Sequence, residues 1–125
     1  MKRILIVDDF EAGRLVLRKL LELKGYACQE AGNGLEALET LQTKKFDLVI
    51  TDNKMPEMTG LELIQSLAQR PKDQRPTIIL LTGHPSQEVY HEAQRADVWA
   101  IFKKPYDFQE LFLKISSALD YREKL

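Results

Sequence analysis

ILIVDD, the stretch from Ile4 to Asp9, joins four aliphatic residues directly to two carboxylates. An unbroken aliphatic run of this length is typical of a strand buried on both faces of a parallel sheet, because neither face then needs polar residues. The largely aliphatic runs 48–51 and 77–81 have the same character. We therefore predict buried parallel strands at 4–7, 48–51 and 77–81.

Two further apolar runs, 26–28 and 98–102, predict two more strands. Between the five runs, apolar residues recur with the period of an amphipathic helix, which places them on one helix face. The clearest such positions are Leu35, Leu38 and Leu41, then Leu61, Ile64 and Leu67, and finally Phe108, Leu111, Phe112, Ile115 and Leu119.

Local signals mark where these helices begin and end. A polar cap followed three residues later by Glu is the capping-box pattern of a helix start. Gly25 stands where the first helix should stop, and the stretch 69–76, with two prolines, predicts a loop. The capping-box pairs are Asn33 with Glu36, Thr59 with Glu62, and Asp107 with Glu110.

The order of strand then helix, repeated five times, predicts an α/β fold with a five-stranded parallel sheet and helices on both faces. Such sheets place their sites outside the carboxyl ends of the strands, at the point where strand order reverses. The residues that follow the predicted strands are Asp8 and Asp9, then Asp52, then Thr82 and Gly83, then Lys103, Lys104 and Pro105. Carboxylates, a hydroxyl, a glycine and a lysine therefore meet at one edge of the sheet.

Three carboxylates in one place repel one another, so we expect Asp8, Asp9 and Asp52 to share a cation. Oxygen ligands without His or Cys suit a hard divalent ion, and Mg²⁺ fits best because it keeps several waters. A nearby lysine adds positive charge, so the site can receive a phosphoryl group. A carboxylate can itself be the nucleophile and form an acyl phosphate. Thr82 and the Gly83 N–H would donate hydrogen bonds to that group.

Each of these features has an ordinary structural explanation when it is taken alone. An acidic pair after a strand is often a helix N-cap with a favourable dipole interaction. A threonine often simply ends a strand, and a lysine is usually a solvated surface residue. Their coincidence at the ends of four strands is what indicates a functional site.

Four motifs occur in order along the chain: Ile4-Leu5-Ile6-Val7-Asp8-Asp9, Asp52-Asn53-Lys54-Met55-Pro56-Glu57-Met58-Thr59-Gly60, Leu81-Thr82-Gly83 and Lys104-Pro105. With these motifs at these intervals, essentially the whole chain resembles the receiver domain of two-component response regulators. The resemblance implies a doubly wound, flavodoxin-like (βα)5 fold with strand order 2-1-3-4-5. The length suits one domain over residues 1–125, with residues 119–125 as a helix end or tail, and we expect no output domain.

The resemblance assigns a role to each acidic residue. Asp52 matches the phosphoacceptor. Asp9 matches a direct metal ligand, and Asp8 matches one that acts largely through water. The backbone carbonyl of Lys54 matches a further Mg²⁺ ligand.

The resemblance also assigns the groups around the phosphoryl oxygens. Thr82 matches the hydroxyl that moves onto the phosphoryl group, and the backbones of Lys54 and Gly83 match its remaining binding groups. Lys104 matches the family's lysine, and the Lys104–Pro105 bond is expected to be cis. Lys103 is the competing lysine, but it does not directly precede proline.

Three positions concern the lifetime of the phosphoryl group and the switch. Lys54 and His84 lie two residues after the phosphoacceptor and the threonine, where the family tunes attack by water. A long lysine beside the acceptor predicts slow autodephosphorylation. Ile101 takes the place of the family's switch aromatic, so its movement coupled to Thr82 is expected to be muted or altered.

The implied function is a phosphoacceptor signalling domain, not an enzyme acting on other molecules. It would take its phosphoryl group from a histidine kinase or a histidine phosphotransfer protein. It would catalyse only its own phosphorylation and dephosphorylation. The fourth helix, fifth strand and fifth helix would then present a changed face to a downstream partner or output domain. The domain would act as a monomer or as a phosphorylation-dependent dimer.

Two alternatives to this function remain open. The first is a degenerate receiver that serves only as a protein-binding module. The second is a phosphatase of the haloacid dehalogenase type, which needs a second acid two residues after its nucleophile. Phe10 and Lys54 occupy those positions after Asp8 and Asp52, which disfavours the second alternative.

Composition limits the remaining possibilities. The 125 residues suit one domain, and a hydrophobic content of 44% is ordinary. A formal net charge of −1 gives no reason to expect direct binding of nucleic acid. Cys28 is the only cysteine, which excludes an internal disulfide. No apolar run is long enough to span a bilayer, so we expect a cytoplasmic protein without membrane attachment.

Overall fold

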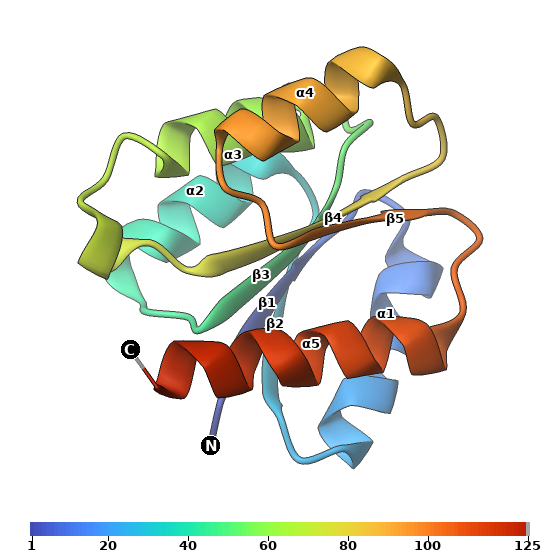
Figure 1. Cartoon of the computed structure of the whole chain (residues 1–125). Coiled ribbons are helices and arrows are strands. Elements are labelled where there is room, and N and C mark those ends of the chain that lie inside the picture. The colour runs from blue at the N-terminus through green and yellow to red at the C-terminus, as the bar shows by residue number, and fades with distance from the viewer. Residues whose placement is uncertain (125) are drawn as a thin grey trace.

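The three aliphatic runs form the three central strands of a parallel sheet in the computed structural model, which describes residues 1–124 (Figure 1). The sheet order is β2-β1-β3-β4-β5, as the family resemblance implied. The strands are β1 (Arg3–Val7), β2 (Ala27–Ala31), β3 (Leu48–Asp52), β4 (Thr77–Thr82) and β5 (Ala100–Lys103). The helices are α1 (Glu11–Leu23), α2 (Gly34–Thr43), α3 (Gly60–Leu67), α4 (Gln87–Arg95) and α5 (Phe108–Glu123), with a 3-10 turn, η1 (Lys72–Gln74).

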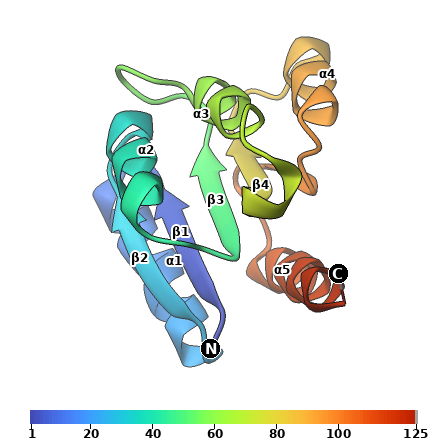
Figure 2. The same ribbon diagram turned by 90° about the vertical axis from the view of Figure 1, so that its left-hand side faces the viewer.

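The sheet is covered on both faces. Helices α1 and α5 lie on one face and α2, α3 and α4 on the other (Figure 1). All neighbouring strands pair in parallel, and the arrows of β1 to β4 point the same way in Figure 2. Because strand order reverses between β1 and β3, the carboxyl ends of these two strands form the switch point at which such folds carry their sites.

Two hydrophobic clusters fill the space between the sheet and the helices. Successive residues of a strand point to opposite faces. Leu5 and Val7 of β1 therefore join the cluster under α2, α3 and α4, while Ile4 and Ile6 join the cluster under α1 and α5. All four side chains are essentially inaccessible to solvent. This burial on both faces explains why the central strands lack polar alternation.

Some boundaries differ from those predicted from the sequence. Strand β2 begins at Ala27 and continues through Gln29 and Glu30 to Ala31, because an edge strand tolerates polar residues that the apolar pattern did not include. Strand β5 begins at Ala100, so Val98 and Trp99 precede it.

The predicted helix starts and the predicted end of the first helix are confirmed in part. Thr59 forms a complete capping box with Glu62, and Gly25 has a φ of 94°, which suits the end of α1. Asn33 caps α2, but the Glu36 carboxylate accepts from the Gly32 N–H and not from Asn33 itself. Asp107 caps α5 through the Glu110 N–H without the reciprocal bond.

The predicted apolar face of α2 is shifted, because Leu35 is exposed whereas Ala37 and Leu41 are buried.

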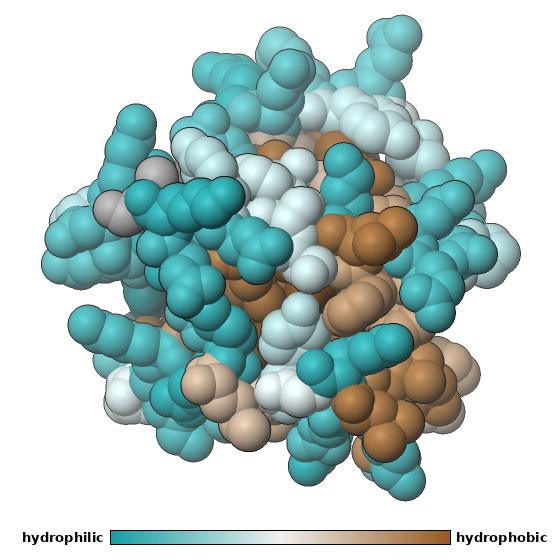
Figure 3. All heavy atoms as spheres, turned by 60° about the horizontal axis from the view of Figure 1, so that its bottom comes forward, coloured by the Kyte–Doolittle hydropathy of each residue, from teal (hydrophilic) through white to brown (hydrophobic). Residues whose placement is uncertain are grey.

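The face formed by α1 and α5 carries hydrophobic side chains among charged ones (Figure 3). Val16 and Leu23 of α1 and Leu113 of α5 are 58%, 84% and 65% exposed. Within residues 1–124, no helix has both the length and the apolar content needed to cross a membrane.

Candidate functional site

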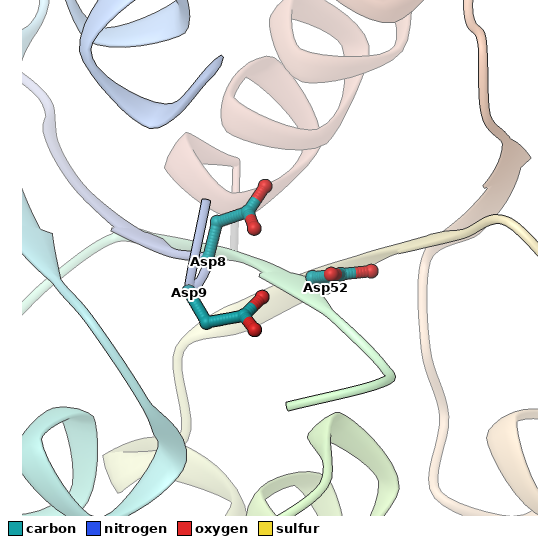
Figure 4. Close-up of side chains that lie close together, drawn as sticks. All are labelled: Asp8, Asp9 and Asp52. Carbon is teal, nitrogen blue, oxygen red and sulfur yellow. The ribbon is translucent and has the colours of Figure 1, made fainter. Parts of the chain in front are cut away.

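Three carboxylates meet where β1 and β3 end (Figure 4). Val7 and Thr51 are register partners, so the residues that follow them, Asp8 and Asp52, emerge side by side. One carboxylate oxygen from each of Asp8, Asp9 and Asp52 lies within 4.8 Å of the others. Asp8 and Asp52 are buried, whereas Asp9 is exposed. The site therefore has a buried floor and one acidic group open to solvent.

Lys104 adds the positive charge of the site. Its Nζ lies 3.1 Å from Asp8 Oδ2 and 3.4 Å from Asp52 Oδ2. The Lys104 N–H donates to the Thr82 carbonyl oxygen at 2.8 Å, which holds the segment after β5 against the end of β4. The Lys104–Pro105 bond is cis, as the resemblance implied. Lys103 is the last residue of β5 and is exposed, so Lys104 is the lysine that reaches the carboxylates.

The charges of the site perturb one another. Burial raises the pKa of Asp52 above its ordinary value, the Asp8 charge adds to this rise, and Lys104 opposes it. Burial would lower the pKa of Lys104, but its hydrogen bond to Asp8 and the charges of Asp8 and Asp52 outweigh burial and raise it. Three carboxylates around one ammonium group leave an excess of negative charge. The donor set is all oxygen, so the residues fit a hard divalent cation such as Mg²⁺.

The loop between β3 and α3 fixes the position of Asp52. The Asn53 N–H donates to Asp52 Oδ1 at 2.9 Å, and the Thr51 hydroxyl donates to the Asp52 carbonyl oxygen at 2.9 Å. The Gly60 N–H returns to the Asn53 carbonyl oxygen at 2.8 Å. Gly60 lies so close to β3 that a Cβ there would overlap the Asp52 carbonyl oxygen. A glycine is therefore required where α3 starts.

The segment after β4 brings Thr82, Gly83 and His84 to the same edge of the sheet. Thr82 is buried, and its Oγ1 accepts a hydrogen bond from the His84 N–H at 3.1 Å. A Cβ at Gly83 would meet nothing within 4 Å, so the space beside its backbone is open. The His84 residue itself is exposed.

Lys54 and Ile101 do not join the carboxylate cluster through their side chains. Lys54 is exposed in the loop after β3. Ile101 lies opposite Leu80 in the β4–β5 register and packs against the cluster under α2, α3 and α4. It therefore packs as an ordinary strand residue in this structure, and its part in switching stays a prediction.

One contact to the site was not predicted from the sequence. Arg14 of α1 donates from Nη1 to the Asp8 carbonyl oxygen and from Nε to Glu30 on β2. Two signals were available: Glu30 is an isolated acid near the end of an edge strand, and Arg14 and Arg18 stand four residues apart on α1. Neither signal identifies a backbone carbonyl as the target.

Two cavities lie at opposite ends of the sheet. One of about 440 Å³ lies beside Asp8 and Lys104, between the start of α1 and the segment that leads into α5. The larger, of about 700 Å³, lies at the opposite edge and is lined in part by Lys44, Lys45 and Arg70. We place the functional site at the carboxylates, because that is where ionisable groups converge on one position.

Comparison with known proteins identifies the family of the chain. Residues 4–116 match the family described as the response regulator receiver domain. The transcriptional regulatory protein ZraR of Klebsiella oxytoca is 37% identical over 118 residues, which cover 93% of this chain and 26% of ZraR. The chain thus spans about a quarter of the length of that relative.

Solved structures show the same fold. A CheY-like response regulator receiver domain protein from Methanospirillum hungatei JF-1 is 34% identical, with a TM-score of 0.92 over 99% of this chain and 98% of that one. The response regulator TrrA from Thermotoga maritima, solved in complex with Mg²⁺ and BeF, is 35% identical, with a TM-score of 0.84 over 94% of this chain and 99% of that one. By its matched residues, its strand order and its acidic site, the chain belongs to the receiver domain family of two-component response regulators.

Proposed function

We propose that this receiver domain accepts a phosphoryl group on Asp52 in a Mg²⁺-dependent reaction. The observation that carries the proposal is the convergence of Asp8, Asp9, Asp52 and Lys104 at the carboxyl ends of β1, β3 and β5. The Asp52 carbonyl oxygen and one of its carboxylate oxygens accept hydrogen bonds from neighbouring donors, which suits a group that must be presented in a fixed orientation.

In the proposed transfer, the donor is a phosphohistidine on a histidine kinase or a histidine phosphotransfer protein. An Asp52 carboxylate oxygen attacks phosphorus, and the new O–P bond forms as the P–N bond breaks. The electron pair of the broken bond returns to the imidazole nitrogen of the donor. The product is an acyl phosphate on Asp52.

Mg²⁺ bound here would offset the negative charge of the carboxylates and of the incoming phosphoryl oxygens. The ligands we assign to it are the carboxylates of Asp8, Asp9 and Asp52 and the backbone carbonyl of Lys54. Lys104 supplies a second positive charge, at a distance from Asp52 already short enough for an ion pair. Because its pKa is raised, Lys104 stays protonated at neutral pH.

Thr82 and Gly83 are the proposed partners of the phosphoryl oxygens. The Thr82 hydroxyl is buried at the end of β4, and its hydrogen bond from the His84 N–H leaves its own proton free to be donated. Drawing Thr82 toward the phosphoryl group would move the segment before α4. We infer that this shifts the face formed by α4, β5 and α5 between two packings, and that a downstream partner or output domain reads the difference.

Lys54 and His84 are the proposed tuning residues for dephosphorylation. Both are exposed, Lys54 in the segment after β3 and His84 in the segment after β4. If Lys54 obstructs the path of an attacking water, the acyl phosphate of Lys54→Ala should decay faster than that of the wild type. Decay that is unchanged or slower would remove the tuning role from Lys54.

The decisive experiment is exposure of the protein to acetyl phosphate and Mg²⁺, followed by intact-mass measurement. We expect one added phosphoryl group in the wild type and none in Asp52→Asn. Omission of Mg²⁺ should abolish the modification. An unmodified wild type that still binds a protein partner would instead support the degenerate binding module.

A further inference from the structure

Arg14 reaches the acidic site without contributing a ligand to it. Its guanidinium Nη1 donates to the carbonyl oxygen of Asp8 at 2.5 Å. This carbonyl belongs to the residue at which the chain leaves β1 and turns into α1. The contact therefore acts on the backbone that carries the carboxylates of Asp8 and Asp9.

Glu30 orients this guanidinium. Arg14 Nε lies 2.8 Å from Glu30 Oε1, and Arg18 Nη1 lies 2.9 Å from Glu30 Oε2. The Arg14 and Glu30 side chains are only 15% and 18% exposed, so solvent screens their ion pair weakly. Hydrogen bonds from Arg18 and Arg14 hold the pKa of Glu30 below its ordinary value, which keeps this carboxylate charged at neutral pH.

The Asp8 residue is constrained at each of its other polar groups. Its N–H donates to the Ala31 carbonyl oxygen at 3.1 Å, its Oδ1 accepts from the Phe10 N–H at 3.0 Å, and its Oδ2 accepts from Lys104. The carbonyl oxygen is the remaining group, and Arg14 holds it. Loss of this contact would free the peptide between Asp8 and Asp9 to rotate, and both carboxylates would move with it.

We propose that Arg14, oriented by Glu30, is a positioning residue that holds the Asp8–Asp9 turn in the geometry needed to bind Mg²⁺. This inference deepens the proposed function and rests on it. Supporting groups behind metal ligands commonly change metal affinity by about 10- to 100-fold when they are removed.

Charge alone makes the opposite prediction. A guanidinium near a cation site repels the cation, so its removal should strengthen Mg²⁺ binding. A positioning role predicts weaker binding after the same removal. The sign of the change in affinity therefore separates the two explanations.

Arg18 provides a matched control. It lies on the same helix, pairs with the same carboxylate and carries the same charge as Arg14. Its side chain contacts Glu22 and Glu30 and not Asp8. Calorimetric titration with Mg²⁺ should show binding weakened about tenfold or more in Arg14→Gln. Arg18→Gln should stay within about twofold of the wild type. Arg14→Lys keeps the charge but lacks the planar guanidinium that holds Asp8 and Glu30 in fixed directions, so it should also bind Mg²⁺ more weakly.

A second measurement uses the metal-free protein. The Phe10 N–H donates to Asp8 Oδ1, so its hydrogen exchange reports on the order of the turn. Exchange should accelerate in Arg14→Gln and Arg14→Lys but not in Arg18→Gln. Unchanged exchange, Mg²⁺ binding at wild-type strength or tighter in Arg14→Gln, or equal losses in the Arg14 and Arg18 variants would overturn the proposal. If the wild type itself binds no Mg²⁺, the proposed function fails, and the exchange data alone decide whether Arg14 orders the turn.

Discussion

Replacing Gly60 by alanine should damage both the stability and the acidic site, because α3 starts in direct contact with the backbone of β3. A Cβ at this position would overlap the Asp52 carbonyl oxygen and lie 2.9 Å from Asn53 Cα. Ordinary contacts begin near 3.4 Å, so relieving the overlap with the Asp52 carbonyl oxygen requires α3 or the end of β3 to move by about 1 Å or more. Backbone atoms cannot rotate out of the way as a side-chain end can.

The expected loss of folding stability in Gly60→Ala follows from two opposing effects. Overpacking costs about 1–3 kcal/mol, and a contact with backbone belongs at the upper end of that range. Alanine is favoured over glycine in a helix by about 0.5–1 kcal/mol, which offsets part of the cost. We expect a net loss of about 2 kcal/mol, which for a domain of this size lowers Tm by about 8 °C. Mg²⁺ binding should also weaken, since the displaced backbone is that of Asp52.

Gly34→Ala is the matched control. Gly34 also stands first in its helix after a side-chain cap, but its Cβ would meet mainly the side chain of Met58, with Cγ at 2.8 Å. Thermal unfolding and Mg²⁺ titration of both variants would test the reasoning. Gly60→Ala with wild-type Tm and Mg²⁺ affinity, or Gly34→Ala with an equal loss of affinity, would refute it.

Three further predictions concern the charges of the site and of its support. Asp52→Asn should raise Tm at pH 7 without divalent ions, because it removes a buried carboxylate whose pKa is raised. Mg²⁺ should stabilise this variant less than it stabilises the wild type. An unchanged or lower Tm without metal would contradict the prediction. Lys104→Gln should lower the free energy of unfolding, measured in urea without metal, by about 1–2 kcal/mol, because Asp8 and Asp52 lose their ammonium partner. Mg²⁺ should stabilise this variant more than it stabilises the wild type. Glu30→Gln tests the lowered pKa of Glu30. Ionised Glu30 contributes stability above pH 4.5, the ordinary pKa of a glutamate, and this stability is lost as the pH falls through the lower pKa of the folded state. The difference in unfolding free energy from the wild type should therefore be large at pH 7 and vanish in acid, and a difference independent of pH would count against the ion pair.

The central strands and the carboxylates of the site follow directly from the sequence. Ile4 to Val7 must be buried on both faces, and parallel strands bring their carboxyl ends to one edge. These two facts place Asp8 and Asp52 together without any knowledge of side-chain packing. Lys104 follows a parallel strand and was therefore expected at the same edge. The family resemblance favoured it over Lys103 because Lys104 directly precedes proline.

Other features depend on contacts that hydrophobic periodicity does not encode. The extension of β2 through Glu30 depends on pairing with β1 and on the arginines of α1. The exposure of Leu35 depends on which side of α2 packs into the core, and that side carries Ala37 and Leu41. The contact of Arg14 with the Asp8 carbonyl joins a long side chain to a backbone atom, and sequence patterns describe backbone acceptors poorly.

The ion pair between Asp8 and Lys104 joins residues 96 positions apart in the sequence. During synthesis, the first four strands would therefore leave the ribosome before the lysine of the site. A nascent chain of that length would carry the carboxylates without their ammonium partner. Competence to accept a phosphoryl group would therefore arise only when translation of the domain is nearly complete.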